Sequence, residues 1–455
     1  MAHESFGSNV PHGKPLSRRD MLRLSALGLG GLAIAACAPA AAPQAGSSSA
    51  EPANNEPRQL IFWGHDQHPI DLAAEGFVPE HPEIEWVSPH PADRGEKIQA
   101  AFAAGSDLPD LYWAEATEAQ DWGCNALLLD LSEELKPELD NYHPLKVSEA
   151  FVQKTGQHVG WPGDISVSGW YYRPDKLEEA GYGDIDFTSW TWTDFYAMSA
   201  DLASQGMYAF VFPADGWSAL YMFALHQLGG TAVSEDGQSI TIDSPEGIEA
   251  MQIVKNLWDA GGLDVAWWSA PYWAALKEGT LIGDFAAAWA RGFWEAQLAE
   301  SGEETAAEWR IARFPGGEGI KYHTGIWGGA QLITPAMANN TADALTFMKY
   351  ALGSVDGASR CGQWGIIPSY RPYLQSDEFL SMRSPIFGDW AFNEFWAGQE
   401  QELSTEFFRP AGWGAVNTVI QREMPTIMTG EYGLEDGMAR IKELATSDFE
   451  RTKCM

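Results

Sequence analysis

The chain has 455 residues, of which 63 are acidic and only 28 are Lys or Arg, so its formal net charge is −35. A charge of this size repels nucleic acids and anionic lipid surfaces, which argues against a function based on binding either one. The length is too great for one ordinary hydrophobic core and predicts two lobes.

Residues 1–36 have the features of an export signal. Arg18 and Arg19 precede an apolar stretch at residues 24–36, which is shorter than the roughly 20 residues that a spanning helix needs. The arginine pair resembles a twin-arginine signal, and Ile34 to Cys37 resemble the lipobox of bacterial lipoproteins. The alternative, an amphipathic first helix, requires a polar face that the stretch lacks. Cleavage before Cys37 and lipidation of that residue would tether the protein to a membrane.

Residues 37–57 are small, polar and rich in proline, so we expect a flexible linker. No later stretch is long and apolar enough to span a membrane, and we expect the mature part to be soluble. Three cysteines follow the linker, namely Cys124, Cys361 and Cys454. They lack C-x-x-C spacing, so neither a zinc site nor a dense disulfide framework is indicated. The sequence leaves two possibilities open, namely one disulfide bond among these cysteines or three unpaired thiols.

The first folded segment, residues 58–90, has a strand, helix, strand pattern. An apolar run is followed by a polar turn, by apolar residues at helical spacing and by a second short apolar run. A helix containing Ile98 and Ala101 and a buried strand at Leu111 to Trp113 come next. This alternation predicts a parallel, doubly wound sheet.

The second half of the chain contains clear helix boundaries. Ser244 is expected as the N-cap of a helix with Pro245 at its first position, and Gly261 is expected to end it. Thr191 and Asp194 have the spacing of a capping box before another apolar helix.

Common catalytic signatures are absent. The chain has no G-x-x-x-x-G-K-[ST], no H-E-x-x-H and no G-x-S-x-G. A G-x-G-x-x-A match lies inside the export signal, where no strand precedes it. His65, Asp66 and His68 are possible metal ligands, but the chain lacks any other dense His or Cys cluster. We therefore expect no enzymatic activity, no cofactor and no metal.

Tryptophan is abundant, with 21 residues. Most of these side chains should pack in the interior. Some indole faces, however, would suit the C–H surface of a sugar ring, or an ammonium group through cation–π attraction.

Seven stretches, taken in chain order, resemble extracellular solute-binding proteins of family 1, the sugar-binding receptors of ABC importers. They are "LIFWGHD"; "LPDLYWAE"; "GWPGDISVSGWYYRPDKLEEAGY" followed by "TWTDF"; "LKEGTLIGDFAAAWARGFW"; "GIWGGAQLITP" before "ADALTFMKYAL"; "GQWGIIPSY"; and "GWGAVNTVIQREMPTIMTGE". The resemblance implies an α/β, two-lobed, periplasmic-binding-protein-like (Venus-flytrap) fold with three interlobe crossings. It implies a first lobe of residues 58–165 plus 320–355 and a second of 166–319 plus 366–445.

The same resemblance implies ligand contacts at the ends of strands and at the crossings. Asp164 and Ser166 lie at the first crossing, where the family often has a carboxylate. Trp327 and Trp413 are flanked by glycines, which permit close backbone approach. The full set of expected ligand-binding residues is His65, Asp66, Glu115, Asp164, Ser166, Trp217, Tyr221, Trp289, Arg291, Trp327 and Trp413.

The leading interpretation is a monomeric, non-enzymatic receptor that captures a di- or oligosaccharide and delivers it to ABC permease subunits. Lipid on Cys37 would hold it on the outer face of the cytoplasmic membrane or in the periplasm. One alternative is an exported glycoside hydrolase with Glu115 and Asp164 as its paired carboxylates. Another keeps the fold but binds a cation such as a polyamine or betaine. A cofactor enzyme exported in folded form would need a nucleotide-binding motif, which the chain lacks.

Overall fold

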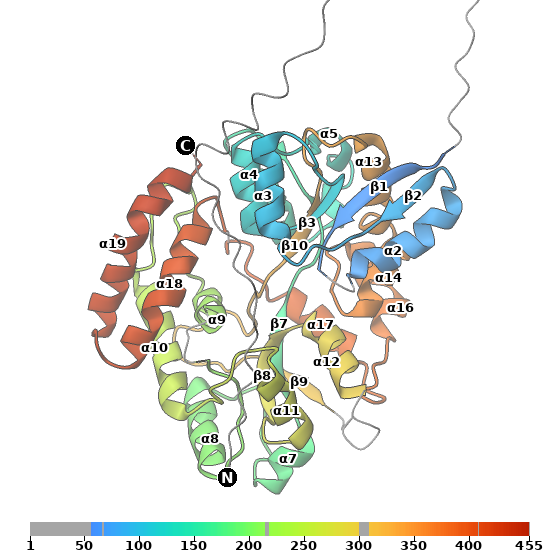
Figure 1. The fold of residues 1–455 in the computed structure, drawn as a ribbon. Coiled ribbons are helices and arrows are strands. Elements are labelled where there is room, and N and C mark those ends of the chain that lie inside the picture. The colour runs from blue at the N-terminus through green and yellow to red at the C-terminus, as the bar shows by residue number, and fades with distance from the viewer. Residues whose placement is uncertain (1–55, 66–67, 214–217, 300–308, 408, 455) are drawn as a thin grey trace, which may run out of the picture. The chain divides into compact units, whose positions relative to one another are not determined.

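Figure 1 shows a computed structural model of the chain, which describes residues 56–65, 68–213, 218–299, 309–407 and 409–454. The export signal, Cys37 and most of the linker lie outside the described residues, as do Asp66 and Trp217. Within the described ranges, no helix combines the length and the apolar character needed to cross a membrane.

The first lobe is built on a five-stranded sheet with the strand order β2-β1-β3-β10-β6. Its strands are β1 (Arg58–Trp63), β2 (Ile84–Val87), β3 (Leu111–Glu115), β6 (Trp161–Pro162) and β10 (Ala330–Ile333). Strand β1 is parallel to β2 and β3, as the strand, helix, strand pattern predicts, whereas β10 runs antiparallel to β3 and β6. The sheet is therefore mixed, because the chain re-enters it at β10 after passing through the second lobe.

Alternate residues of β3 face opposite sides of this sheet. Leu111 and Trp113 pack in one hydrophobic core, and Tyr112 and Ala114 pack in another. Side chains of a strand alternate in this way because successive Cβ atoms point to opposite faces. Helices cover both faces: α2 (Pro69–Phe77), α3 (Arg94–Ala104), α4 (Ala116–Cys124), α5 (Ser132–Leu135), α6 (Pro144–Ala150), α13 (Thr341–Ala351) and α14 (Val355–Trp364). A short hairpin, β4 (Phe151–Val152) and β5 (Gln157–His158), follows α6.

The second lobe contains a three-stranded sheet with the order β8-β7-β9. Its strands are β7 (Ser168–Tyr172), β8 (Gly283–Ala287) and β9 (Arg310–Ala312), and both pairings are antiparallel. The predicted parallel sheet is therefore wrong for this lobe, as it is for β10 and β6 in the first. Among the described residues of this lobe, parallel pairing is limited to single bridges, such as Tyr208 with Leu281.

Helices surround this second sheet and its large hydrophobic core. They are α7 (Pro174–Glu179), α8 (Trp192–Ser204), α9 (Ala219–Gln227), α10 (Pro245–Ala260), α11 (Ala270–Glu278), α12 (Ala290–Ala299), α17 (Phe392–Glu400), α18 (Trp413–Met428) and α19 (Leu434–Thr452). Two short helices, α15 (Arg371–Leu374) and α16 (Asp377–Leu380), connect α14 to α17. In Figure 1, α18 and α19 lie side by side at the red end of the chain.

The predicted helix boundaries in this lobe are confirmed. Ser244 caps α10 by accepting a hydrogen bond from Gly247 N, Pro245 is its first residue, and Gly261 ends it with φ of 82°. The capping box of α8 is present between Thr191 and Asp194. Local capping chemistry therefore fixes where these helices begin and end.

Three segments cross between the lobes side by side. Asp164 N donates to Ala330 O (3.1 Å), Ile165 N to Ile367 O (2.9 Å) and Ser168 N to Gly325 O (3.0 Å). The lobe boundaries given above stay predictions. Ile326 and Trp327, however, pack in the second core while Ala330 packs in the first. The chain therefore passes from the second core to the first at residues 328–329, which we call the middle crossing.

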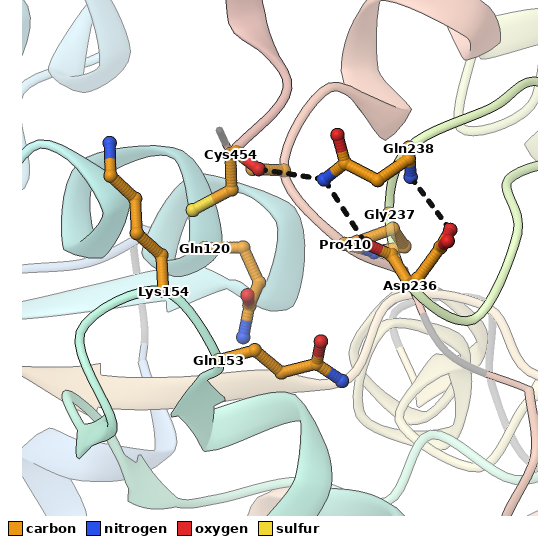
Figure 2. Close-up of a pocket in the computed structure, with 9 residues that line it drawn as sticks. Gln120, Gln153, Lys154, Asp236, Gly237, Gln238, Pro410 and Cys454 are labelled. Carbon is orange, nitrogen blue, oxygen red and sulfur yellow. Dashed lines mark hydrogen bonds between the residues drawn. The ribbon is translucent and has the colours of Figure 1, made fainter.

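A disulfide joins Cys124 at the end of α4 to Cys454 after α19, with a Cα–Cα distance of 5.7 Å. Cys361 is a buried free thiol. The disulfide bond lies beside a cavity of about 260 Å³. Figure 2 shows Gln120 and Lys154 on one side of this cavity and Asp236 and Gln238 on the other. Gln238 Nε2 donates to Cys454 O at 3.0 Å. The end of the chain is thus attached both to the first lobe and to a turn of the second.

A buried carboxylate in β8 connects several parts of the second lobe. Asp284 has no exposed surface. It accepts hydrogen bonds from Val211 N (3.1 Å), Trp267 Nε1 (2.9 Å) and Tyr272 Oη (3.2 Å). Burial raises the pKa of Asp284 to about 7.

This raised pKa predicts a pH dependence of stability. The folded chain keeps the Asp284 proton up to about pH 7, whereas the unfolded chain loses it near pH 4. The stability that the proton provides is fully present below pH 4 and is lost as pH rises to 7, by at most about 1.4 kcal/mol per pH unit. Urea unfolding of wild type and Asp284→Asn between pH 4 and 8 should show a flatter profile for the variant. Identical slopes would contradict this assignment.

Candidate ligand-binding site

Three of the predicted residues meet at the middle crossing, around Gly328. A Cβ atom built on Gly328 would lie 3.5 Å from Ser166 Oγ, 3.6 Å from Trp289 Nε1 and 3.8 Å from Glu115 Oε2. Glu115 belongs to the first lobe, Ser166 to the first crossing and Trp289 to the second lobe. We call the space that these three side chains share with Gly328 the Gly328 site. The backbone of Gly328 itself has φ of 83°, a left-handed conformation that favours glycine.

Trp289 is the aromatic member of the Gly328 site. Its indole N–H donates to Trp327 O at 2.8 Å, so the flat face of the ring is what it offers to a ligand. Trp327 is only 7% exposed and its ring packs 5.3 Å from Trp289 and 5.2 Å from Trp267 between centroids. Trp327 therefore supports Trp289 and supplies a backbone carbonyl.

Glu115 ends β3 and also begins α4. Its backbone N donates to Glu118 Oε2 (2.9 Å), and the two residues form a capping box. Burial and the neighbouring Glu115 charge raise the pKa of Glu118 to about 7. The helix cap thus fixes the direction in which the Glu115 carboxylate leaves the sheet.

His65 follows β1 in the chain, as predicted, and is exposed. Its Nε2 is 2.9 Å from Arg94, which also donates to Trp113 O at 2.8 Å and lies over the Tyr112 ring. Sequence reasoning missed Arg94, because nothing in its surroundings distinguishes it from a solvated helix residue. Arg94 and Glu115 both act on the Glu118 carboxyl group, because the Glu115 charge raises its pKa and the Arg94 charge lowers it.

Asp164 holds the crossings together. It is 4% exposed and accepts hydrogen bonds from Ser166 N (3.0 Å), Ser166 Oγ (2.5 Å) and Ile367 N (3.3 Å). Ser166 adopts a left-handed conformation with φ of 53°, which these contacts stabilise. The structure thus brings Ser166 to the site, whereas the Asp164 carboxylate is occupied by hydrogen bonds from Ser166 and Ile367.

Three further predicted residues have side chains that are engaged in other contacts. Arg291 donates to Gly362 O and Gln363 O (both 2.9 Å) and holds the end of α14. Tyr221 has no exposed surface, because α9 is buried on every side within the second core. Trp413 is 3% exposed and packs in the same core. These predictions rested on position within a motif, which does not tell whether a side chain points inward.

Sequence reasoning also missed two aromatic residues beside Trp289. Trp268 lies 5.6 Å and Phe293 6.0 Å from the Trp289 ring between centroids. The density of tryptophan in "AWWSAPYW" was a signal for Trp268. Among the described residues, no group of three His, Cys, Asp or Glu side chains could hold a metal ion.

Behind the site, Gly329 faces a buried group of charges. Its carbonyl accepts from Lys146 Nζ at 2.8 Å, and Lys146 also pairs with Glu149. Arg409 donates to Glu149 Oε1 through Nε (3.0 Å) and a terminal nitrogen (2.6 Å). Burial alone would raise the pKa of Glu149, but Arg409 and Lys146 outweigh it and hold that pKa below its usual range.

Comparison with known proteins places these observations in a family. Residues 70–357 match the model of the family described as "Bacterial extracellular solute-binding protein". An arabinooligosaccharide-binding protein of Halalkalibacterium halodurans is 24% identical over 44% of this chain. A lactose-binding protein of Rhizobium radiobacter is 31% identical over 29% of it. The matched regions span 45% and 32% of these relatives, less than half of their lengths.

Solved structures extend the similarity of fold to most of the chain. The ABC transporter associated binding protein of B. animalis subsp. lactis Bl-04, in complex with β-1,6-galactobiose, superposes with a TM-score of 0.75 at 20% identity. The superposition covers 88% of this chain and 100% of that protein. The family match over residues 70–357, which is more than half of the chain, shows that the chain belongs to the bacterial extracellular solute-binding proteins.

Proposed function

We propose that this protein captures a sugar at the Gly328 site, without altering it, and delivers it to the permease subunits of an ABC importer. The observation that carries this proposal is the meeting of Glu115, Ser166 and Trp289 around a glycine at the middle crossing. A ligand that contacts both lobes at a crossing stabilises the closed form selectively, which is how such a receptor would signal that it is loaded.

The chemistry of the Gly328 site suits a sugar. A carboxylate at Glu115 accepts hydrogen bonds from hydroxyl groups, and charge-assisted bonds of this kind are strong. The Ser166 hydroxyl donates to Asp164, which leaves its oxygen as an acceptor. The half-buried Trp289 face suits the C–H surface of a sugar ring. The sugar-binding relatives and the galactobiose complex support the same ligand class.

The contacts of Asp164 argue against the hydrolase alternative. A retaining or inverting glycosidase needs two carboxyl groups that flank the scissile bond. The Asp164 carboxylate instead accepts hydrogen bonds from the crossing segments and is almost fully buried. Incubation with chromogenic glycosides should therefore release no product.

A substitution at Gly328 tests the site. In Gly328→Ala the new methyl group would occupy the space shared by Ser166, Trp289 and Glu115. We expect saturable quenching of tryptophan fluorescence by at least one sugar in a panel of arabino-, galacto- and malto-saccharides, lactose and betaine. The dissociation constant of that sugar should rise by roughly tenfold or more in the variant, because the methyl group would fill this space. A tenfold rise corresponds to a loss of about 1.4 kcal/mol of binding free energy.

Gly206→Ala is the matched control. Gly206 has φ of 78°, close to that of Gly328, but a Cβ there would meet nothing within 4 Å. Both variants should lose about 1 to 2 kcal/mol of stability from the left-handed backbone, and only Gly328→Ala should lose affinity. Equal affinities in the two variants would place the ligand elsewhere, and quenching by betaine alone would favour the cation alternative.

Export through the twin-arginine route and lipidation of Cys37 complete the proposal. The motif at Arg18 and Arg19 and the lipobox-like residues before Cys37 support it. Cells fed labelled palmitate should incorporate it into the wild-type protein, and Cys37→Ala should abolish both the label and retention in the membrane fraction. Retention of the Cys37→Ala protein in that fraction would contradict the anchor.

A further inference from the structure

The disulfide bond joins the two lobes to each other. Cys124 is the last residue of α4, which belongs to the first lobe. Cys454 follows α19, which packs on α10 and α18 of the second lobe. Phe449, in the last turn of α19, has its ring in the second core. The bond is therefore a covalent connection between the lobes in addition to the crossings.

Neither end of this bond has slack. Cys124 lies within α4, and only Lys453 separates Cys454 from the end of α19. Lys453 N donates to Phe449 O at 2.7 Å, which continues the hydrogen-bond pattern of the helix. Gln238 Nε2 donates to Cys454 O at 3.0 Å and ties this carbonyl to a turn of the second lobe. Both cysteines are thus carried on ordered parts of their own lobes.

The non-covalent contacts at the same place are small. Gly412, which directly precedes α18, donates from its backbone N to Asp121 Oδ1 of α4 at 2.9 Å. The neighbouring Ala411 packs in the first-lobe core that contains Ala114. A hydrogen bond and a small apolar contact can separate when two domains move, whereas a disulfide bond cannot. The covalent bond is therefore the strongest restraint on movement at this point.

Helix α4 connects the disulfide bond to the Gly328 site. Glu115, whose carboxylate lines that site, is the N-cap of α4, and Cys124 ends the helix after nine residues. At 1.5 Å per residue, the helix spans about 13 Å. A movement of Cys124 relative to the second lobe would therefore also move Glu115 relative to Trp289, which the second lobe carries.

The geometry of a disulfide bond leaves little room for such movement. Bonded cysteines usually have Cα atoms about 4.4 to 6.8 Å apart, and the distance here is 5.7 Å. The two Cα atoms can therefore separate by only about 1 Å more. Because Cys124 lies about 13 Å from Glu115, a rotation of about 10° about an axis through the Gly328 site would move it by about 2 Å. The bond excludes rotations of this size that part α4 from the end of α19.

We propose that the bond between Cys124 and Cys454 is a strap that restricts the movement of the two lobes relative to each other. The oxidised chain samples a narrow range of lobe arrangements, and the reduced chain samples a wide range. This restraint acts within the folded state, so it is distinct from the stability that a native disulfide gives against unfolding. It holds whatever the ligand is.

The strap also affects ligand binding, a consequence that rests on the proposed function. A site whose walls are already held in place loses less conformational freedom when it binds a ligand. The strap holds the Glu115 wall of the Gly328 site relative to the Trp289 wall through α4. A longer or broken strap therefore weakens the binding of the sugar.

A variant with a longer strap separates this role from stability. Gly-Ser-Gly inserted between Lys453 and Cys454 keeps the bond but adds up to about 10 Å of reach. It hardly changes the loop-closure entropy, because the bonded cysteines are already 330 residues apart. Reduced wild type and Cys124→Ser with Cys454→Ser remove the strap altogether. Cys361→Ser is the control, because its thiol is buried and unpaired.

Double electron–electron resonance on the full chain measures the distance between the lobes without any ligand. Nitroxide labels would be attached through a ketone-bearing amino acid at Gln99 on α3 and Ala197 on α8, which leaves the native cysteines unlabelled. Both positions are exposed, and their helices belong to different lobes. Figure 1 shows α3 and α8 well separated from each other. A phosphine would serve as the reductant.

We expect one narrow distance distribution for the oxidised wild type and for Cys361→Ser. Reduction, the double serine variant and the insertion should each broaden the distribution by about twofold or more. The insertion variant should unfold at the same urea concentration as the wild type, within about 10%. If the double serine variant fails to fold, the insertion variant decides the result, because it keeps the bond.

Two outcomes would count against the strap in distinguishable ways. Equal distance distributions for the oxidised wild type and the insertion variant would overturn it, whatever the effect of reduction on stability. In calorimetry with the tightest-binding sugar of the panel, the dissociation constant should rise by about threefold or more in the insertion variant. An unchanged constant would overturn the link to the Gly328 site. Absence of binding to every sugar would remove the proposed function, and the distances alone would then decide on the strap.

Discussion

Glu149→Gln should lower the free energy of unfolding by about 3 to 5 kcal/mol, the usual result of removing one partner from a buried ion pair. Lys146 and Glu149 have no exposed surface, and Arg409 is 4% exposed. The substitution would leave two buried cations without the anion that pairs with both of them. Equilibrium urea unfolding at pH 7 measures the difference directly.

A surface pair provides the control for this prediction. Glu134 pairs with Lys349, and their side chains are 39% and 53% exposed. Glu134→Gln should cost less than about 1 kcal/mol, because solvent screens exposed pairs. If Glu149→Gln were no more destabilising than Glu134→Gln, the buried charges would not hold the crossing as described. The low pKa of Glu149 also predicts that its contribution is fully present above about pH 4.5 and is lost as pH falls from there through the folded-state pKa.

Loss of the disulfide between Cys124 and Cys454 should be the second large effect. The bond closes a loop with a sequence separation of 330 residues, and native disulfides typically contribute about 2 to 5 kcal/mol. Thermal unfolding with and without a dithiol reductant should show a lower Tm for the reduced wild type. Cys124→Ser with Cys454→Ser should have that lower Tm in both conditions.

Cys361 offers an internal control, because it is buried and unpaired. Cys361→Ser should keep the response to the reductant. Peptide mapping under non-reducing conditions should recover the Cys124 peptide joined to the Cys454 peptide. A Tm that ignores the reductant, or a Cys124 peptide joined to Cys361, would contradict the assigned pairing.

Local patterns in the sequence predicted much of the fold. Capping residues such as Ser244 and Thr191 act within one helical turn, so their roles can be inferred without tertiary structure. The pairing of the strands depends on distant contacts. The antiparallel sheet of β7, β8 and β9 and the link between Cys124 and Cys454 join residues more than 100 positions apart, and no local signal specifies them.

The candidate site was predicted only in part, for a related reason. Glu115, Ser166 and Trp289 come from ends of strands and from a crossing, where the family resemblance places ligand contacts, and the structure brings them together. Tyr221 and Trp413 face the interior because their helices are packed within the second core. Arg94 and Phe293 reach the neighbourhood of the site through the packing of α3 and α12, which the sequence does not encode in any short motif.

A crystal structure of the full chain with the tightest-binding sugar of the panel tests the central claim most directly. We predict an intact sugar at the middle crossing, with a hydroxyl group within about 3 Å of the Glu115 carboxylate and a ring face against Trp289. A sugar bound away from Gly328, or one found cleaved, would contradict the account.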